Sequence, residues 1–133
     1  MNDIETRDDI ELLIREFYKK VMNDEKIGFI FTNVALLDLK HHLPIITDFW
    51  ENVLFDTGKY TRNAMIPHFK LNEQVNFQPQ HFERWLFHFN ETVKETFYGK
   101  VAELACTRAK SIAAIMQIKL QQTNESKLSD LNG

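Results

Sequence analysis

The scarcity of residues that break helices is the feature of this sequence that most restricts its fold. Only four Gly and three Pro occur in 133 residues, and the apolar residues between them recur at helical spacing. Apolar residues three and four positions apart lie on one face of a helix, whereas strict alternation indicates a strand. The chain has no alternating pattern of useful length, no internal repeat and no low-complexity linker. The sequence therefore predicts an all-α protein.

The first predicted helix begins near Asp8. Asp8 and Glu11 have the spacing of a capping box, in which the first side chain accepts a hydrogen bond from a backbone N–H and the second reaches back. The residues that follow place six side chains on one helical face: Ile10, Leu13, Ile14, Phe17, Tyr18 and Val21. Gly28 then interrupts a short segment that ends at Ile30-Phe31.

A second apolar stripe predicts a helix that ends near Gly58. Its members recur at helical spacing: Leu39, His42, Leu43, Ile46, Phe49, Trp50 and Val53. Pro44 is compatible with this helix if the helix begins only a turn earlier, because the N–H groups of the first turn have no intrahelical partners. Residues 59–77 are predicted to be irregular, with one turn of helix around residues 64–69.

The third predicted helix opens at Pro79, a residue type that is favoured in the first turn. Gln78 is the expected cap, and Phe77 and Phe82 are spaced to form a hydrophobic staple across it. A last helix is predicted over the apolar positions of residues 101–116. The length predicts one domain, which we expect to span residues 1–122. Residues 123–133 are polar and are expected to form a disordered tail.

The charge of the chain argues against nucleic acid and anionic membranes as partners. Its net charge is −3, so it has no basic surface of the kind that binds them.

The residues from Met1 to Asp9 are polar and acidic, which predicts no signal peptide, and no apolar run approaches the length of a membrane span. Cys106 is the sole cysteine, which excludes an intramolecular disulfide. We therefore expect a cytoplasmic protein.

Polar groups on apolar helical faces are the candidates for chemistry, because burying them costs free energy unless they are bound. Tyr18, His42 and Trp85 lie on predicted core faces of three different helices, and His68 lies in the irregular stretch. Taken singly, residues such as Tyr18, His42 and Trp85 are more often satisfied core residues than functional ones, and His68 fits a partly exposed loop residue as well as an iron ligand. The eleven Phe residues likewise fit either a Phe-rich core or the walls of a pocket for a flat ligand. No spacing typical of zinc, phosphate or triad sites occurs.

Taken together, these segments resemble a group III truncated haemoglobin from about Ile10 to Leu120. The residues that carry the resemblance, and the spacing between them, are Phe17-Tyr18, His42-Leu43-Pro44 leading to Phe49-Trp50, Tyr60, Met65-x-x-His68 and Phe82-Glu83-Arg84-Trp85-Leu86. The chain departs from the family at Arg62-Asn63-Ala64-Met65, where Gly-Asn-Pro-Met is common, and at Pro67, which directly precedes His68. Both departures bear on the tilt of the His68 imidazole.

The resemblance implies a two-over-two helical sandwich around haem b, with His68 as the proximal iron ligand. It makes Tyr18 and Trp85 the distal hydrogen-bond donors and His42 the histidine of the distal helix. The residues expected to contact the cofactor are Phe31, Ile46, Phe49, Trp50, Tyr60, Arg62 and Met65, with Tyr60 and Arg62 named for the propionates. A single protein ligand leaves the opposite side of the iron open to a gas.

The resemblance thus implies reversible binding of oxygen, nitric oxide or carbon monoxide at ferrous iron, in oxygen handling or in protection against nitric oxide or reactive oxygen. Two alternatives stay open from the sequence. One is a haem enzyme with nitric oxide dioxygenase or peroxidase-like activity, which would need a separate reductase. The other is a helical interaction module without haem.

Overall fold

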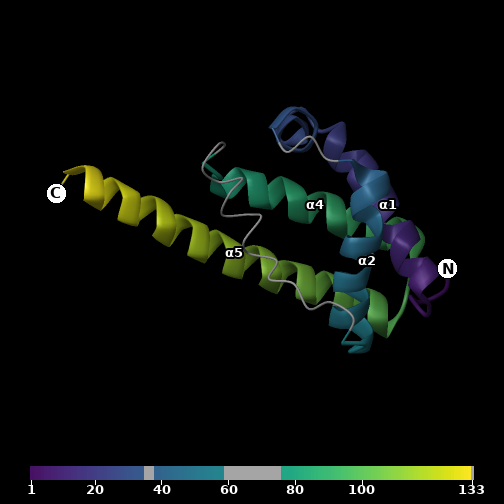
Figure 1. The fold of residues 1–133 in the computed structure, drawn as a ribbon. Helices are drawn as coiled ribbons and strands as arrows, with labels where there is room; N and C mark the ends of the chain where they lie inside the picture. The colour runs from purple at the N-terminus through teal and green to yellow at the C-terminus, as the bar shows by residue number, and fades with distance from the viewer. Residues whose placement is uncertain (35–37, 59–75, 133) are drawn as a thin grey trace.

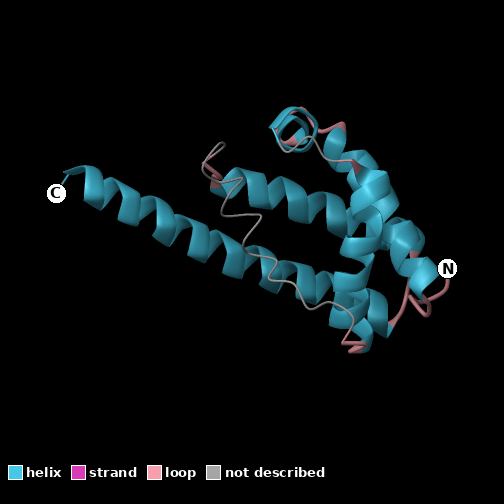
Figure 2. Ribbon diagram, viewed as in Figure 1, coloured by secondary structure: helices cyan, strands magenta, loops and turns pink. Residues whose placement is uncertain are grey.

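In the computed structural model, which describes residues 1–34, 38–58 and 76–132, every regular element is a helix (Figure 2). The α-helices are α1 (Arg7–Met22), α2 (Leu39–Phe55), α4 (Pro79–Thr96) and α5 (Lys100–Asn132), and a short π-helix, η1, spans Ile30–Val34. The described ranges contain no strand. The prediction of an all-α protein is confirmed.

The helices form two pairs that pack on each other. Helix α1 packs on α2, and α4 packs on α5, whereas the contacts between the pairs join α1 to α4 and α2 to α5. Figure 1 shows α4 and α5 side by side, with α5 extending well beyond α4 toward the C-terminus. Two helices stacked on two helices is the arrangement that the resemblance implies.

Helix α1 begins earlier than the sequence predicts, because a different pair of residues forms its cap. The Thr6 hydroxyl accepts a hydrogen bond from the backbone N–H of Asp9 at 3.2 Å, and the Asp9 carboxylate accepts from the N–H of Thr6 at 3.1 Å. This reciprocal pair satisfies two N–H groups that otherwise lack partners. The expected cap at Asp8 and Glu11 is therefore wrong, although the helix itself is confirmed.

The core forms between the four α-helices, with the apolar face of α1 packed on α2 and α4, and α5 packed on α4 and α2. The buried side chains of α1 are those of the predicted stripe apart from Tyr18, which is partly buried: Ile10, Leu13, Ile14, Phe17 and Val21. Helix α4 contributes Phe89 and Val93. Helix α5 contributes alanines at helical spacing, Ala102, Ala105 and Ala109, whose small size lets another helix approach closely.

The start of α4 matches the prediction in detail. Gln78 is the cap and Pro79 the first helical residue, and the N–H of Gln78 donates to Nδ1 of His81 at 3.0 Å. The rings of Phe77 and Phe82 lie 5.8 Å apart, which confirms the hydrophobic staple. This cap fixes the residue at which α4 begins, and therefore the register of the residues that follow it.

Gly28 allows the chain to fold back against the end of α1. A Cβ at this position would lie 2.5 Å from the carbonyl oxygen of Met22, a distance that no side chain can accommodate. The N–H of Gly28 also donates to the carbonyl of Asp24 at 2.8 Å. The close approach therefore requires glycine and leads the chain directly into η1.

Helix α5 continues through Asn132, whereas the sequence predicts a disordered tail from residue 123. No Gly or Pro occurs between residues 121 and 132, so no residue in that segment forces the helix to end. The limit of the domain at residue 122 stays a prediction. Although α5 is 33 residues long, neither it nor any other helix in the described ranges is apolar enough to cross a membrane.

Candidate functional site

Tyr18 and Trp85 come from different helices and contact the same ring. Tyr18 lies on α1 with its ring centroid 5.0 Å from that of Phe17, and Trp85 lies on α4 at 5.4 Å from Phe17. Both contacts are edge-to-face, which is a favourable arrangement for aromatic pairs. The fold therefore brings together two of the residues that the sequence singles out as distal donors.

The Tyr18 side chain lies in an apolar environment that keeps its hydroxyl protonated. It is partly buried, and its ring also packs edge-to-face on Phe31 of η1 at 5.8 Å. Burial raises the pKa of Tyr18 to about 12. Among the described residues, neither the Tyr18 hydroxyl nor the Trp85 indole N–H has a hydrogen-bond partner. Tyr18 thus carries a neutral O–H and Trp85 a neutral N–H, and both groups can donate a hydrogen bond.

Trp85 belongs to a row of stacked aromatic rings that leads into the core. Its ring is stacked on Phe89 at 5.7 Å with 17° between the planes, and Trp50 is stacked on the same Phe89 at 4.8 Å and 24°. Trp50 is only 4% exposed. The structure thus places Trp50 in the core beside Phe89, and its expected contact with haem stays a prediction.

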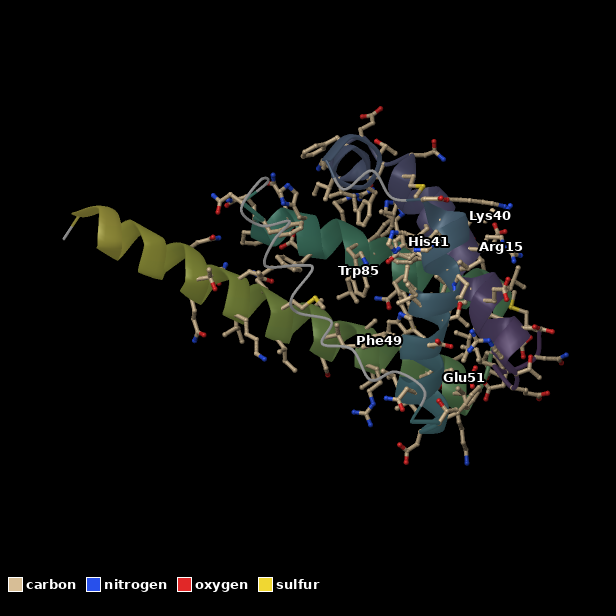
Figure 3. The ribbon with its side chains drawn as sticks, viewed as in Figure 1. Arg15, Lys40, His41, Phe49, Glu51 and Trp85 are labelled. Carbon is tan, nitrogen blue, oxygen red and sulfur yellow. The ribbon has the colours of Figure 1, made fainter. Side chains whose placement is uncertain are left out.

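Helix α2 contributes partly buried side chains to the same region. Ile46 and Phe49 pack against the core without being covered completely, and His42 is also partly buried. In Figure 3, Phe49 and Trp85 point into the space between α2, α4 and α5. The His42 ring contacts that of His41 at 5.2 Å, and no ring contact joins it to Tyr18 or Trp85 in the described residues.

Four of the predicted site residues lie outside the described residues. They are Tyr60, Arg62, Met65 and His68. The proximal ligation by His68 and the propionate contacts of Tyr60 and Arg62 therefore stay predictions.

Several of the expected cofactor contacts are apolar side chains that the described residues cover only in part, which is compatible with an apolar cofactor. Partly buried apolar side chains from α1, η1, α2 and α4 leave apolar surface uncovered, and the cofactor candidates Phe31, Ile46 and Phe49 are among them. The hydroxyl of Tyr18 and the indole N–H of Trp85 lie among these apolar side chains, with no hydrogen bond to another described residue. In the described ranges, no group of three His, Cys, Asp or Glu side chains could hold a bare metal ion.

A buried carboxylate that the sequence does not single out joins the end of α1 to α4. Oδ2 of Asp24 accepts hydrogen bonds from Nε and Nη2 of Arg84 at 3.0 and 2.8 Å, and from Nε2 of His88 at 2.6 Å. Its Oδ1 accepts from the backbone N–H groups of Lys26 and Ile27 at 2.7 and 3.1 Å. The Asp24 side chain is 2% exposed. Asp24, Arg84 and His88 together form the Asp24 clamp.

The charge state of the clamp follows from its contacts. Burial alone would raise the pKa of Asp24, but the hydrogen bonds from His88 and Arg84 and from two backbone N–H groups outweigh it and hold the pKa well below its usual value. Asp24 is therefore ionised at neutral pH. An open pocket of about 370 Å³ adjoins the clamp, and its lining includes neither Tyr18 nor Trp85.

The chain is similar in sequence and in structure to known truncated haemoglobins. A group 3 truncated haemoglobin of Campylobacter jejuni is 29% identical over 114 residues, which cover 84% of this chain and 87% of that protein. The crystal structure of a group III truncated haemoglobin from Campylobacter jejuni matches with a TM-score of 0.78 and 28% identity, covering 90% of this chain and 95% of the other.

The family comparison covers nearly all of the described fold. Residues 2–124 match the bacterial-like globin family, and this range includes α1, α2, α4 and most of α5. The match to this family therefore extends over the whole aromatic site and not over one motif alone. By its sequence match and its fold, the chain belongs to the bacterial-like globin family, as its resemblance to group III truncated haemoglobins predicts.

Proposed function

We propose that this globin holds haem b through His68 and binds oxygen or another diatomic gas, with Tyr18 and Trp85 donating hydrogen bonds to the gas. Membership of the globin family implies that the chain binds haem. Haem iron with one protein ligand supplies an open position for a gas. The family therefore favours this interpretation over an interaction module without haem.

The observation that carries the proposal is the meeting of Tyr18 and Trp85 at Phe17. Their two donors have no partner among the described residues, and the rings around them are apolar. An unpaired donor in an apolar site is unfavourable unless a ligand accepts its hydrogen. A gas that takes up negative charge on binding, as oxygen does, would satisfy both donors.

The strength of these hydrogen bonds sets how fast bound oxygen is released, and the release rate separates oxygen delivery from a protective role. A hydrogen bond to a charged group contributes about 1.5–3 kcal/mol, and about 1.4 kcal/mol corresponds to a factor of ten in an equilibrium. Two such donors would therefore slow the release of oxygen greatly. Slow release suits protection against nitric oxide or reactive oxygen better than bulk oxygen delivery.

His42 has a different role in the proposal. It lies on α2 one turn before Ile46 and is partly buried, without a ring contact to either donor in the described residues. We assign it to the distal wall of the pocket, where it does not bind the iron permanently. Its removal should therefore leave the ferrous spectrum five-coordinate in the absence of gas, as in the parent.

The oxygen dissociation rate tests the proposal directly. The purified ferrous protein should show the absorption bands of haem, and Tyr18→Phe and Trp85→Phe should each speed oxygen release by roughly 10- to 100-fold. Carbon monoxide takes up less charge, so its release should change much less. Oxygen off-rates within about twofold of the parent in both variants and in the double variant would refute the donor roles.

The iron ligand needs its own test. His68→Ala should abolish stable haem retention, and added imidazole should restore it because imidazole can replace the missing side chain. His41→Ala serves as the control, since it also removes an imidazole and His41 is exposed on α2. Full haem occupancy with an unchanged spectrum in His68→Ala would refute the assignment of His68.

A further inference from the structure

The Asp24 clamp lies between the two chain segments that carry the distal donors. Asp24 follows α1, the helix of Tyr18, just after its cap residue Asn23. Its partners on α4, Arg84 and His88, lie one position before and three positions after Trp85. One carboxylate is therefore bonded to α4 on both sides of Trp85.

We propose that Asp24 is a positioning residue, which fixes α4 against the end of α1 and so holds the Trp85 indole N–H and the Tyr18 hydroxyl in one mutual arrangement. This inference rests on the proposed function, because it assigns Asp24 a role in donation to the gas. Asp24 itself does not reach the ligand. It acts through the placement of the two helices.

The geometry of the carboxylate makes it suited to this role. Oδ1 is used by the backbone of the turn after α1, and Oδ2 is used by the side chains from α4. Arg84 binds through two nitrogens, which restricts direction as well as distance. Rotation or sliding of α4 along α1 would break several of these bonds at once.

The aromatic contacts alone leave the direction of the indole N–H less restricted. Trp85 is stacked on Phe89 with 17° between the planes, and stacking of this kind tolerates lateral displacement of one ring over the other. The edge contact with Phe17 limits displacement on one side. The bonds of Arg84 and His88 to Asp24 supply the remaining restraint, because they fix the helix from which the indole projects.

The test compares substitutions inside and outside the clamp. Asp24→Asn removes the negative charge, and Arg84→Met removes the two-nitrogen contact from the other side while keeping most of the apolar part of the side chain. Asp3→Asn is the matched control, because Asp3 is also a carboxylate that accepts backbone hydrogen bonds, from Val101 and Ala102 at 3.0 and 2.8 Å, at the start of α5.

The first measurement is the indole N–H resonance of Trp85 in the carbonmonoxy holoprotein. The chain has two Trp residues, so Trp85→Phe assigns the signals and Trp50 serves as an internal reference. Asp24→Asn and Arg84→Met should shift or broaden the Trp85 signal more than that of Trp50. Asp3→Asn should move neither signal. Arg84→Met keeps the test valid if Asp24→Asn does not fold.

The second measurement is oxygen dissociation in a double-mutant cycle. Asp24→Asn should speed release by about threefold or more in the parent and by less than about twofold in the Trp85→Phe background, because its effect passes through Trp85. Equal effects in both backgrounds, or a Trp85 signal that responds no more to Asp24→Asn than to Asp3→Asn, would overturn the inference. If Trp85→Phe itself leaves the off-rate unchanged, the donor role under the proposed function has failed instead.

Discussion

The two ends of α1 are each fixed by a charged cluster, and the two clusters are built in opposite ways. At the start of α1, the cation Arg7 donates to two carboxylates on α2, Asp48 at 2.6 Å and Glu51 at 2.9 Å. Beyond the end of α1, the anion Asp24 accepts from two side chains on α4. These contacts join the start of α1 to α2 and the segment just after its end to α4.

Neither Arg7 nor Asp24 has the charge that the dipole of α1 favours at its end of the helix. A helix favours anions at its start and cations at its end, and Asp8 and Asp9 at the start and Lys19 and Lys20 in the last turn follow this rule. Arg7 and Asp24 carry the opposite charges. Their charges are therefore explained by the partner helices α2 and α4 and not by α1 itself.

The clusters differ in the exposure of their carboxylates. The single carboxylate of the Asp24 clamp is 2% exposed, whereas Arg7 is shared between Glu51, which is 6% exposed, and Asp48, which is 35% exposed. Water screens an exposed ion pair and replaces its lost bonds, but it cannot do so for a buried carboxylate. We therefore expect the Asp24 clamp to contribute more to stability than the Arg7 cluster.

The largest predicted effect is that of Asp24→Asn on stability. The amide keeps the shape of the side chain but loses the charged hydrogen bonds to Arg84 and His88, so the free energy of unfolding should fall by about 2–3 kcal/mol. Urea denaturation of the carbonmonoxy holoprotein measures the change. A loss below about 0.5 kcal/mol, typical of an exposed pair, would remove the distinction between the two ends.

The pH dependence of stability should identify the same carboxylate. The pKa of Asp24 is lowered in the folded protein, so below the ordinary aspartate pKa the unfolded chain binds more protons than the folded one. The contribution of Asp24 is therefore complete above about pH 4 and is lost as the pH falls toward the folded pKa. Asp24→Asn should lose less stability than the parent over this acid range. Parallel acid curves for the two proteins would contradict the assignment.

The helices and their buried faces could be predicted because they depend on local spacing. The stripe that contains Leu13 and Phe17 is buried as expected, and the staple of Phe77 and Phe82 forms because both residues flank one helix start. The cap of α1 was misplaced because Thr6 with Asp9 and Asp8 with Glu11 have the same spacing, and the sequence does not decide between them.

The contacts between helices could not be predicted in the same way. Tyr18 and Trp85 were identified singly, but their meeting at Phe17 depends on how α1 and α4 pack. Asp24 was missed because it lies in a polar turn, and its partners on α4 are 60 and 64 positions away. The spacing of Arg84 and His88 on one helical face was the available signal, and it is equally typical of an exposed face.

Arg7→Met should have a smaller effect than Asp24→Asn. Methionine keeps most of the apolar length of the side chain and removes the bonds to Asp48 and Glu51, which should cost about 1–2 kcal/mol because Glu51 is mostly buried. Arg7→Lys should be intermediate, since it keeps the charge but loses the planar fork. Urea denaturation under the same conditions gives the comparison. A larger loss than that of Asp24→Asn would reverse the order of the two ends.

The smallest effect is expected at an exposed pair in the middle of α1, which provides the baseline for both ends. Arg15 donates to Glu11 at 2.7 Å one helical turn away, and the two side chains are 43% and 37% exposed. Arg15→Met is the same substitution as Arg7→Met on the same helix, so it differs mainly in the absence of a second helix. We expect a loss of at most about 0.5 kcal/mol, because a pair of this kind is screened by water and salt. The loss should shrink further in 1 M salt, where the screening length is only about 3 Å. A loss as large as that of Arg7→Met would mean that the link from α1 to α2 contributes nothing beyond an ordinary surface ion pair.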